Sequence, residues 1–263
     1  MTEPTTDWRT ALEQIARTDT LLVALDFDGT LAPLQDDPMQ SRALPESAAA
    51  IARLADLPAT IVAYVSGRSL PDLRIIGEHD DASKVWLAGS HGVEYWRPAD
   101  AVVTELDEPD ETHERELLER LNAEAKQLVN GFEGAWIEDK SVGFALHTRL
   151  TPPDIAPGIQ GVIDALVARE APGWRRRPGH NLIEYSWRHE GKDAAVARRR
   201  EQTGASAVLF AGDDVTDEDA LGSLQEHDLG VRVGPGETSA RVRVADAHEF
   251  AELLSALADL RAS

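Results

Sequence analysis

The chain has 263 residues, enough for one large domain or for a core with one inserted module. A net charge of −21 argues against nucleic acid or an anionic membrane as a partner, and the absence of cysteine excludes disulfides, zinc thiolate sites and a thiol nucleophile. No apolar run approaches the roughly 18 residues of a membrane span, and the polar N-terminus is unlike a signal peptide, so we expect a cytoplasmic protein.

The first predicted strand of the core, Leu21–Leu25, runs straight into Asp26-Phe27-Asp28-Gly29-Thr30. A short apolar run that ends in acidic residues and glycine is typical of a strand buried on both faces of a parallel sheet. Ligands bind at the carboxyl ends of such strands. Two carboxylates one residue apart can hold a divalent cation and still present one oxygen to an electrophile. The pattern therefore favours phosphoryl chemistry over an acidic loop that merely ends a strand.

A helix over residues 45–57 and a second buried strand, Thr60–Val65, follow and lead into Ser66-Gly67-Arg68. A small hydroxyl at a strand end, followed by glycine, can donate to a phosphate oxygen together with backbone N–H groups of the next turn. As an isolated tripeptide this sequence indicates only a turn. Its position at the end of a second apolar run makes Ser66 a candidate phosphate ligand.

A helix over residues 70–76 and a third strand, Val85–Ala88, lead into a loop that contains His91 between two glycines. Glycines at such positions let the backbone approach another group closely. For His91, a structural role and a substrate contact are equally open at this stage.

From about Asp107 the sequence changes from alternating strands and helices to helix, strand, strand, repeated twice. This order is typical of an α+β unit with an antiparallel sheet that is covered on one face. Within it, Glu138 and Lys140 stand near a strand end, and Glu184 lies on the last strand. A Glu and a Lys two residues apart could equally form a solvated face.

After this insertion, Lys192 opens a helix that extends to Gln202, and the apolar strand Ala207–Ala211 leads into GDDVTDEDA. A lysine at a helix start can neutralise a nucleophile and an incoming phosphate, while helix N–H groups point at the anion. Carboxylates crowded at a strand end repel one another unless a cation joins them. We therefore expect Asp213 and then Asp214 to coordinate a metal, with Asp217 bracing the loop or a metal-bound water.

These motifs together carry a family resemblance. DFDGTLAPL resembles the first motif of the haloacid dehalogenase-like phosphohydrolases, APLQDDP and GSHGVE are similar to trehalose-phosphate phosphatases, and GDDVTDEDA matches the fourth motif. The resemblance implies an α/β fold, a doubly wound parallel sheet interrupted by a type C2b cap. The boundaries that we predict are 1–106 and 188–263 for the core and 107–187 for the cap.

The resemblance also implies a role for each candidate residue. Asp26 would be the nucleophile and Asp28 the general acid/base, with Lys192 and Ser66 completing the catalytic set. Mg²⁺ would be held by Asp26, Asp28, Asp213 and Asp214. Substrate contacts would come from a wider set of core and cap residues, namely Thr30, Gly67, Arg68, His91, Glu138, Lys140 and Glu184.

The expected function is Mg²⁺-dependent hydrolysis of trehalose 6-phosphate by a monomer with a small sugar phosphate as its partner. Two departures from the family pattern weaken the sugar assignment, because His180 stands where lysine is expected and Thr148 where tyrosine is expected. The same chemistry on sucrose phosphate or a mannosyl phosphate is the first alternative. The second is a phospho-accepting module without turnover, which would need neither Asp28 nor a cap.

Overall fold

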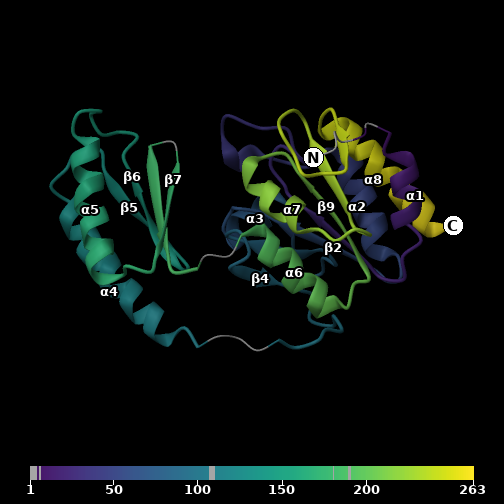
Figure 1. The fold of residues 1–263 in the computed structure, drawn as a ribbon, viewed down its shortest axis with the longest axis horizontal. Helices are drawn as coiled ribbons and strands as arrows, with labels where there is room; N and C mark the ends of the chain where they lie inside the picture. The colour runs from purple at the N-terminus through teal and green to yellow at the C-terminus, as the bar shows by residue number, and fades with distance from the viewer. Residues whose placement is uncertain (1–4, 6, 107–109, 180, 189–190) are drawn as a thin grey trace. The chain divides into compact units, whose positions relative to one another are not determined.

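The computed structural model describes residues 5, 7–106, 110–179, 181–188 and 191–263 (Figure 1). The chain divides into two compact units. We call residues 1–106 with 190–263 the core unit, and residues 107–189 the inserted unit. Among the described residues, no helix is both long enough and apolar enough to cross a membrane.

The core unit is built around a seven-stranded sheet in the order β11-β10-β9-β1-β2-β3-β4. Its strands pair in parallel, except that β4 runs antiparallel to β3. The chain fills the sheet outward in one direction from β1 and in the other from β9, so these two neighbours flank the topological switch point at which open α/β sheets bind ligands. The strands are β1 (Leu21–Leu25), β2 (Thr60–Val65), β3 (Trp86–Gly89), β4 (Glu94–Trp96), β9 (Ala207–Gly212), β10 (Leu229–Val233) and β11 (Val242–Val244).

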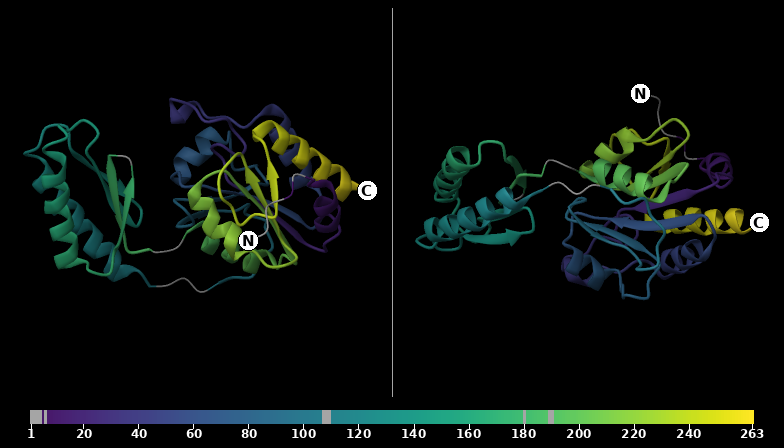
Figure 2. Two further views of the ribbon diagram at one scale, coloured as in Figure 1. Left: turned by 45° about the horizontal axis from the view of Figure 1, so that its top comes forward. Right: turned by 90° about the horizontal axis from the view of Figure 1, so that it is seen from below.

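Helices cover both faces of this sheet (Figures 1 and 2). Alternate residues of β1 belong to different apolar clusters: Leu21 and Val23 pack with α1, α2, α3 and α8, whereas Leu22 and Ala24 pack with α6 and α7. Every residue of β1 is fully buried, which confirms the predicted doubly wound α/β core. The helices are α1 (Arg9–Ile15), α2 (Pro45–Asp56), α3 (Leu70–Ile76), α6 (Lys192–Thr203), α7 (Glu218–Ser223) and α8 (Ala247–Ala262), with 3-10 turns at Pro38–Gln40 and Val215–Asp217.

The inserted unit is a four-stranded antiparallel sheet, in the order β5-β6-β8-β7, with α4 and α5 packed on one face (Figure 1). Phe144, Leu146 and Ile183 point to that face and form an apolar cluster with the two helices. Since side chains alternate along a strand, the opposite face carries the intervening residues, which are mainly polar, and we call it the polar face. The elements are α4 (Thr112–Val129), β5 (Trp136–Lys140), β6 (Gly143–His147), α5 (Ala156–Glu170), β7 (Arg175–Gly179) and β8 (Leu182–Ser186).

Three of the four outermost strands, namely β4, β11 and β7, are short or carry interrupting residues, whereas β5 has five residues and no proline. In the core unit, β4 and β11 have three residues each, and Thr5 pairs with β11 through Thr5 N–H to Arg241 O and Arg243 N–H to Thr5 O, both at 3.0 Å. In the inserted unit, β7 contains three arginines and a proline. The strand β4 is absent from the sequence-based prediction because three partly buried residues are too few for an alternating pattern.

Candidate active site

Four predicted site residues come together at one edge of the sheet in the core unit: three follow the carboxyl ends of adjacent strands and the fourth begins a helix. Asp26 follows β1 and donates its backbone N–H to Ala211 O of β9 at 2.9 Å. Ser66 follows β2, and Asp213 follows β9 on the other side of β1. Lys192 is the first residue of α6. The parallel register therefore places groups that lie up to 187 residues apart in sequence at one edge of the sheet, since Asp213 minus Asp26 is 187.

The ammonium of Lys192 joins two buried carboxylates. Its Nζ lies 2.5 Å from Asp26 Oδ1 and 2.6 Å from Asp217 Oδ1, and the lysine itself is only 3% exposed. Burial lowers the pKa of Lys192, but the negative charges of Asp26 and Asp217 outweigh burial and raise the pKa overall. Lys192 therefore stays charged and offsets negative charge at the site.

Asp217 braces the loop that carries Asp213. It is fully buried, and its Oδ2 accepts hydrogen bonds from the backbone N–H groups of Asp213 at 3.1 Å and Asp214 at 3.0 Å. With Oδ1 on Lys192, both of its oxygens are engaged by the protein. This arrangement is what the sequence predicts for Asp217.

The acidic side chains at this edge could hold a metal ion. Asp26, Asp213 and Asp217 each offer one oxygen, and these three atoms lie within 4.8 Å of one another. Burial, supported by the charge of Asp217, raises the pKa of Asp26 to about 8 against the lowering effect of Lys192, and burial likewise raises the pKa of Asp213. Thr30 Oγ1 lies 3.4 Å from an oxygen of each of Asp26 and Asp213. Oxygen ligands that repel one another in this way fit a small divalent cation such as Mg²⁺.

Asp28 and Asp214, the other two carboxylates in the predicted ligand set, have protein partners of their own. Arg68 binds Asp28 through two hydrogen bonds, from Nε at 2.6 Å and from Nη2 at 2.7 Å. Asp214 Oδ1 accepts from the backbone N–H of Val215 at 2.6 Å. Their roles as metal ligands stay predictions. The contact with Arg68 orients the Asp28 carboxylate. The sequence gives no indication of this contact.

The Ser66-Gly67-Arg68 loop and the His91 loop pack directly against each other. His91 N–H donates to Ser66 O at 2.9 Å and Ser90 N–H to Arg68 O at 2.6 Å. A Cβ added to Gly67 would lie 2.6 Å from His91 Cε1, so only glycine leaves room for the imidazole. Ser90 and His91 adopt φ values of 50° and 57°, a left-handed conformation that costs non-glycine residues free energy.

Within the part of the chain that the structure describes, these contacts leave the Ser66 hydroxyl proton available. Ser66 Oγ accepts the backbone N–H of Arg68 at 3.2 Å, and a hydroxyl has a single O–H to donate. Glu94 stabilises the neighbouring loop, because its Oε2 accepts from Leu70 N–H at 2.8 Å and from Ser90 Oγ at 2.7 Å. The structure thus places His91 beside the predicted phosphate loop rather than in the apolar core.

The three cap residues singled out in the sequence share the polar face of the inserted unit. Lys140 Nζ lies 2.6 Å from Glu138 Oε1 on β5. Glu138 and Glu184 both pair with Ala145 of β6, from opposite sides, and strand partners project on the same face. The carboxylates of Glu138 and Glu184 therefore lie in one row across the sheet, on either side of Ala145.

Of the two departures from the family pattern, Thr148 is described and His180 lies outside the described residues. Thr148 is 3% exposed, and its Oγ1 lies 3.3 Å from Asn181 O and 3.5 Å from Gln160 Nε2. Its hydroxyl thus hydrogen-bonds within the inserted unit.

Two further polar-face residues, Trp136 and His147, were missed in the sequence. His147 Nε2 lies 2.7 Å from Glu138 Oε2, and its ring stacks on Trp136, which is directly opposite on the neighbouring strand. The alternation of β5 and β6 about a short turn could have indicated this pairing, because it places residues 136 and 147 on the face of Glu138.

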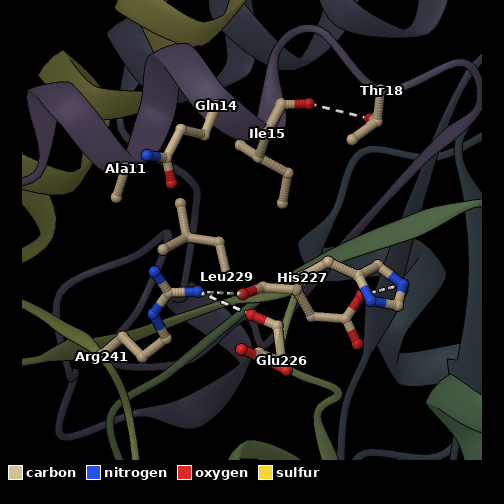
Figure 3. Close-up of a pocket in the computed structure, with 9 residues that line it drawn as sticks. Ala11, Gln14, Ile15, Thr18, Glu226, His227, Leu229 and Arg241 are labelled. Atoms are coloured by element: carbon tan, nitrogen blue, oxygen red, sulfur yellow. Dashed lines mark hydrogen bonds and ion pairs between the residues drawn. The ribbon is translucent and has the colours of Figure 1, made fainter.

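A cavity of about 670 Å³ in the core unit is separate from this site (Figure 3). It is lined by residues of α1, of the segment before β10 and of the segment before β11, among them Gln14, His227 and Arg241. The guanidinium of Arg241 donates to Glu226 O at 2.9 Å and to Asp228 O at 3.2 Å, just before the amino end of β10 (Figure 3). The catalytic candidates follow the carboxyl ends of the strands, so this cavity lies at the opposite edge of the sheet.

Comparisons with known proteins agree on one family. A family model for trehalose-phosphatase matches residues 24–251. Trehalose-phosphate phosphatases of Mycobacterium marinum and Mycobacterium ulcerans are 31% and 30% identical over 256 residues, covering 89% of this chain and 60% of theirs. The chain therefore spans 60% of the length of these curated relatives.

Solved structures show the same fold. The C-terminal domain of the C. albicans trehalose-6-phosphate phosphatase has a TM-score of 0.70 at 20% identity, with 98% of each chain covered. The Aspergillus fumigatus trehalose-6-phosphate phosphatase has a TM-score of 0.72 at 20% identity, covering 98% of this chain and 99% of that one. Because the family model matches far more than half of the sequence and its span holds the whole constellation from Asp26 to Asp217, the chain belongs to the trehalose-phosphatase family.

Proposed function

We propose that this protein is a phosphoric monoester hydrolase that converts trehalose 6-phosphate to trehalose and phosphate. The observation that carries the proposal is the buried contact of Lys192 with Asp26, at the switch point of the sheet and beside Asp213. Lys192 and Asp26 are both buried, and they lie next to acidic groups that could hold a metal. Because removing so many charges from water costs free energy, this arrangement is better explained by a role in phosphoryl transfer than by a contribution to stability. Membership of the family supports the sugar phosphate as substrate.

In the proposed reaction, a carboxylate oxygen of Asp26 attacks phosphorus and forms an aspartyl-phosphate as the bond from phosphorus to the sugar oxygen breaks. Asp28 gives its proton to the departing sugar oxygen. Asp28 then removes a proton from water, which attacks the aspartyl-phosphate and releases phosphate and free Asp26. In this structure both oxygens of Asp28 accept hydrogen bonds from Arg68, so a protonated Asp28 that acts as the acid would give up one of these two contacts.

The remaining core residues bind and orient the phosphoryl group. Ser66 Oγ accepts from Arg68 N–H and would donate its own O–H to a phosphate oxygen, and the backbone N–H groups of the turn at Gly67 would supplement it. Lys192 offsets negative charge on Asp26 and on the transferred group. Mg²⁺ bound by Asp26 and Asp213 would supply Lewis-acid stabilisation of phosphoryl charge, with Asp28 and Asp214 as the further ligands that the sequence predicts.

For the inserted unit we propose the role of a cap that binds the sugar. Its polar face holds Glu138, Lys140 and Glu184, whose charged groups suit the hydroxyls of a sugar ring distal to the phosphate. The ion pair between Glu138 and Lys140 would keep both groups charged and oriented before substrate arrives. These residues would select the sugar, whereas the core residues would perform the chemistry.

The test is phosphate release from a panel of phosphates, namely trehalose 6-phosphate, sucrose phosphate, a mannosyl phosphate and p-nitrophenyl phosphate, each with and without Mg²⁺. We expect the highest kcat/KM on trehalose 6-phosphate and activity only with the cation. A higher value on another sugar phosphate would replace the substrate and keep the chemistry. Stable labelling of Asp26 without release of phosphate would instead favour a phospho-accepting module.

A further inference from the structure

Both oxygens of the Glu138 carboxylate are held by neighbours on the polar face. Lys140 Nζ lies 2.6 Å from Oε1, and His147 Nε2 lies 2.7 Å from Oε2. Lys140 is two residues further along the same strand, so both side chains point to the same face. His147 lies on β6, diagonally across from Glu138, which pairs with Ala145. The carboxylate therefore has one partner along its strand and one across the sheet.

The imidazole of His147 is itself fixed by an aromatic partner. Its ring is parallel to Trp136 within 2°, with ring centroids 4.5 Å apart, and the two residues are directly opposite in the register of β5 and β6. The guanidinium carbon of Arg149 lies 5.2 Å from the Trp136 centroid. The His147 side chain is only 17% exposed. Stacking restricts rotation of the imidazole, so its hydrogen bond to Glu138 is set before any ligand binds.

The protonation of this cluster follows from its contacts. Burial raises the pKa of Glu138, but hydrogen bonds from Lys140 and His147 outweigh burial and hold it below its ordinary value. An ionised carboxylate only accepts hydrogen bonds, so Nε2 of His147 carries the proton in this contact. Each oxygen of Glu138 keeps a further lone pair, because a carboxylate has about four acceptor positions.

We propose that His147 is a positioning residue for sugar recognition, which acts by fixing Glu138 as an oriented acceptor for sugar hydroxyls. This inference rests on the proposed function, because it assigns a task to the sugar-binding face of the cap. His147 acts through Glu138 and takes no part in the chemistry at Asp26. Trp136 supports it by holding the imidazole flat.

The experiment measures kcat and KM on trehalose 6-phosphate and on p-nitrophenyl phosphate for the wild type, His147→Ala, His147→Gln, Glu138→Ala and the His147→Ala/Glu138→Ala double variant. We expect His147→Ala to raise KM for trehalose 6-phosphate about tenfold, and to lower the ratio of the two kcat/KM values by a similar factor. Gln can place an amide N–H near the position of Nε2, so His147→Gln should recover most of the loss. In the Glu138→Ala background, His147→Ala should add less than about twofold.

A matched control comes from the other face of the same strand. Lys126 of α4 pairs with Asp139 at 2.7 Å, and Asp139 points away from the polar face because it adjoins Glu138. Lys126→Ala therefore removes a cap ion pair of the same kind as that of Glu138 and should leave both substrates near wild-type values. Thermal unfolding of every variant checks that the inserted unit is folded.

The outcomes distinguish a failure of the proposed substrate from a failure of the positioning role of His147. If the wild type turns over a different sugar phosphate, the proposed substrate is wrong, and the same five variants measured on that sugar decide the role of His147. Equal losses on the sugar phosphate and the aryl phosphate would overturn the positioning role. So would losses of His147→Ala and Glu138→Ala that multiply in the double variant, because His147 would then act independently of Glu138.

Discussion

The two candidate sites of this protein are built by different geometries. The core site collects buried groups from strand ends and helix starts that are distant in sequence, as in the contact of Lys192 with Asp26 at 2.5 Å. The polar face of the inserted unit collects half-exposed groups from neighbouring strands through register alone, as in the contact of Glu138 with Lys140. The proposed chemistry, which needs desolvated charge, thus uses groups that the sheet topology brings together, whereas the proposed sugar recognition uses a strand surface on which every second residue can be changed separately.

The largest expected effect is the loss of turnover in Asp26→Asn. The substitution keeps the shape of the side chain but removes the attacking anion and an oxygen of the acidic group, so activity should fall on the order of a thousandfold or more on both substrates. Phosphate release and circular dichroism are the measurements. Normal turnover by a folded variant would exclude Asp26 as the nucleophile. The core site would then no longer be assigned the chemistry in contrast to the polar face.

Removal of divalent cations should have the next largest effect, again on both substrates. Asp26 and Asp213 have raised pKa values because burial and neighbouring carboxylates disfavour their charges, so bound Mg²⁺ should stabilise the fold as well as restore activity. At a free concentration about a hundred times Kd the stabilisation is about 2.7 kcal/mol, a rise in Tm of several degrees. Calorimetry with chelator and then with Mg²⁺ checks this. An unchanged Tm together with unchanged activity would rule out the metal.

Substitution in the cap should affect the two substrates unequally. Glu184→Ala and Glu138→Ala should each lower kcat/KM on trehalose 6-phosphate about tenfold or more, since a desolvated sugar hydroxyl left without its partner costs about 1–3 kcal/mol. p-Nitrophenyl phosphate has no distal sugar, so its loss should be much smaller. Equal losses would mean that these carboxylates support the fold or the chemistry, and no loss on either substrate would leave them as a solvated face.

The smallest expected effect is the pH dependence of the Glu138 cluster. Glu138 has a lowered pKa in the folded protein, so it contributes stability above its ordinary pKa of 4.5, and this contribution is lost as pH falls below that value. Because the side chain is 42% exposed, the contribution should stay below about 1 kcal/mol. Denaturant unfolding of the wild type and Glu138→Gln at pH 7 and pH 3.5 should show a difference that shrinks in acid. A constant difference would show that the ion pair is irrelevant to stability.

Much of the core could be predicted from the sequence, because each buried strand is an apolar run that ends at a motif. Leu21–Leu25 and Thr60–Val65 have the predicted bounds, and the parallel order then brings Asp26, Ser66 and Asp213 to one edge. That convergence follows from fold topology and needs no knowledge of side-chain contacts.

Side-chain partners could not be predicted in the same way. The run Arg198-Arg199-Arg200 gives no sign that Arg199 is 1% exposed, between the rings of Trp86 and Tyr95, where its Nη2 donates to Leu87 O at 2.6 Å. Burial lowers the pKa of Arg199 to about 10. Which of three adjacent arginines turns inward depends on how α6 packs on the β3–β4 edge, and a sequence pattern does not contain that placement.

The outer edges of the two sheets have a consequence for how copies of this protein behave at high concentration. An exposed strand edge is a template for pairing with another chain, and long flat edges lead to aggregation. Here β4 and β11 offer three residues each, Thr5 occupies part of the β11 edge, and β7 presents arginines and Pro178, which has no N–H to donate. Intermolecular strand addition is thereby disfavoured at these edges. We expect variants such as Pro178→Val or Arg176→Val to be less soluble at high concentration, a change that measurements of activity and of unfolding would not detect.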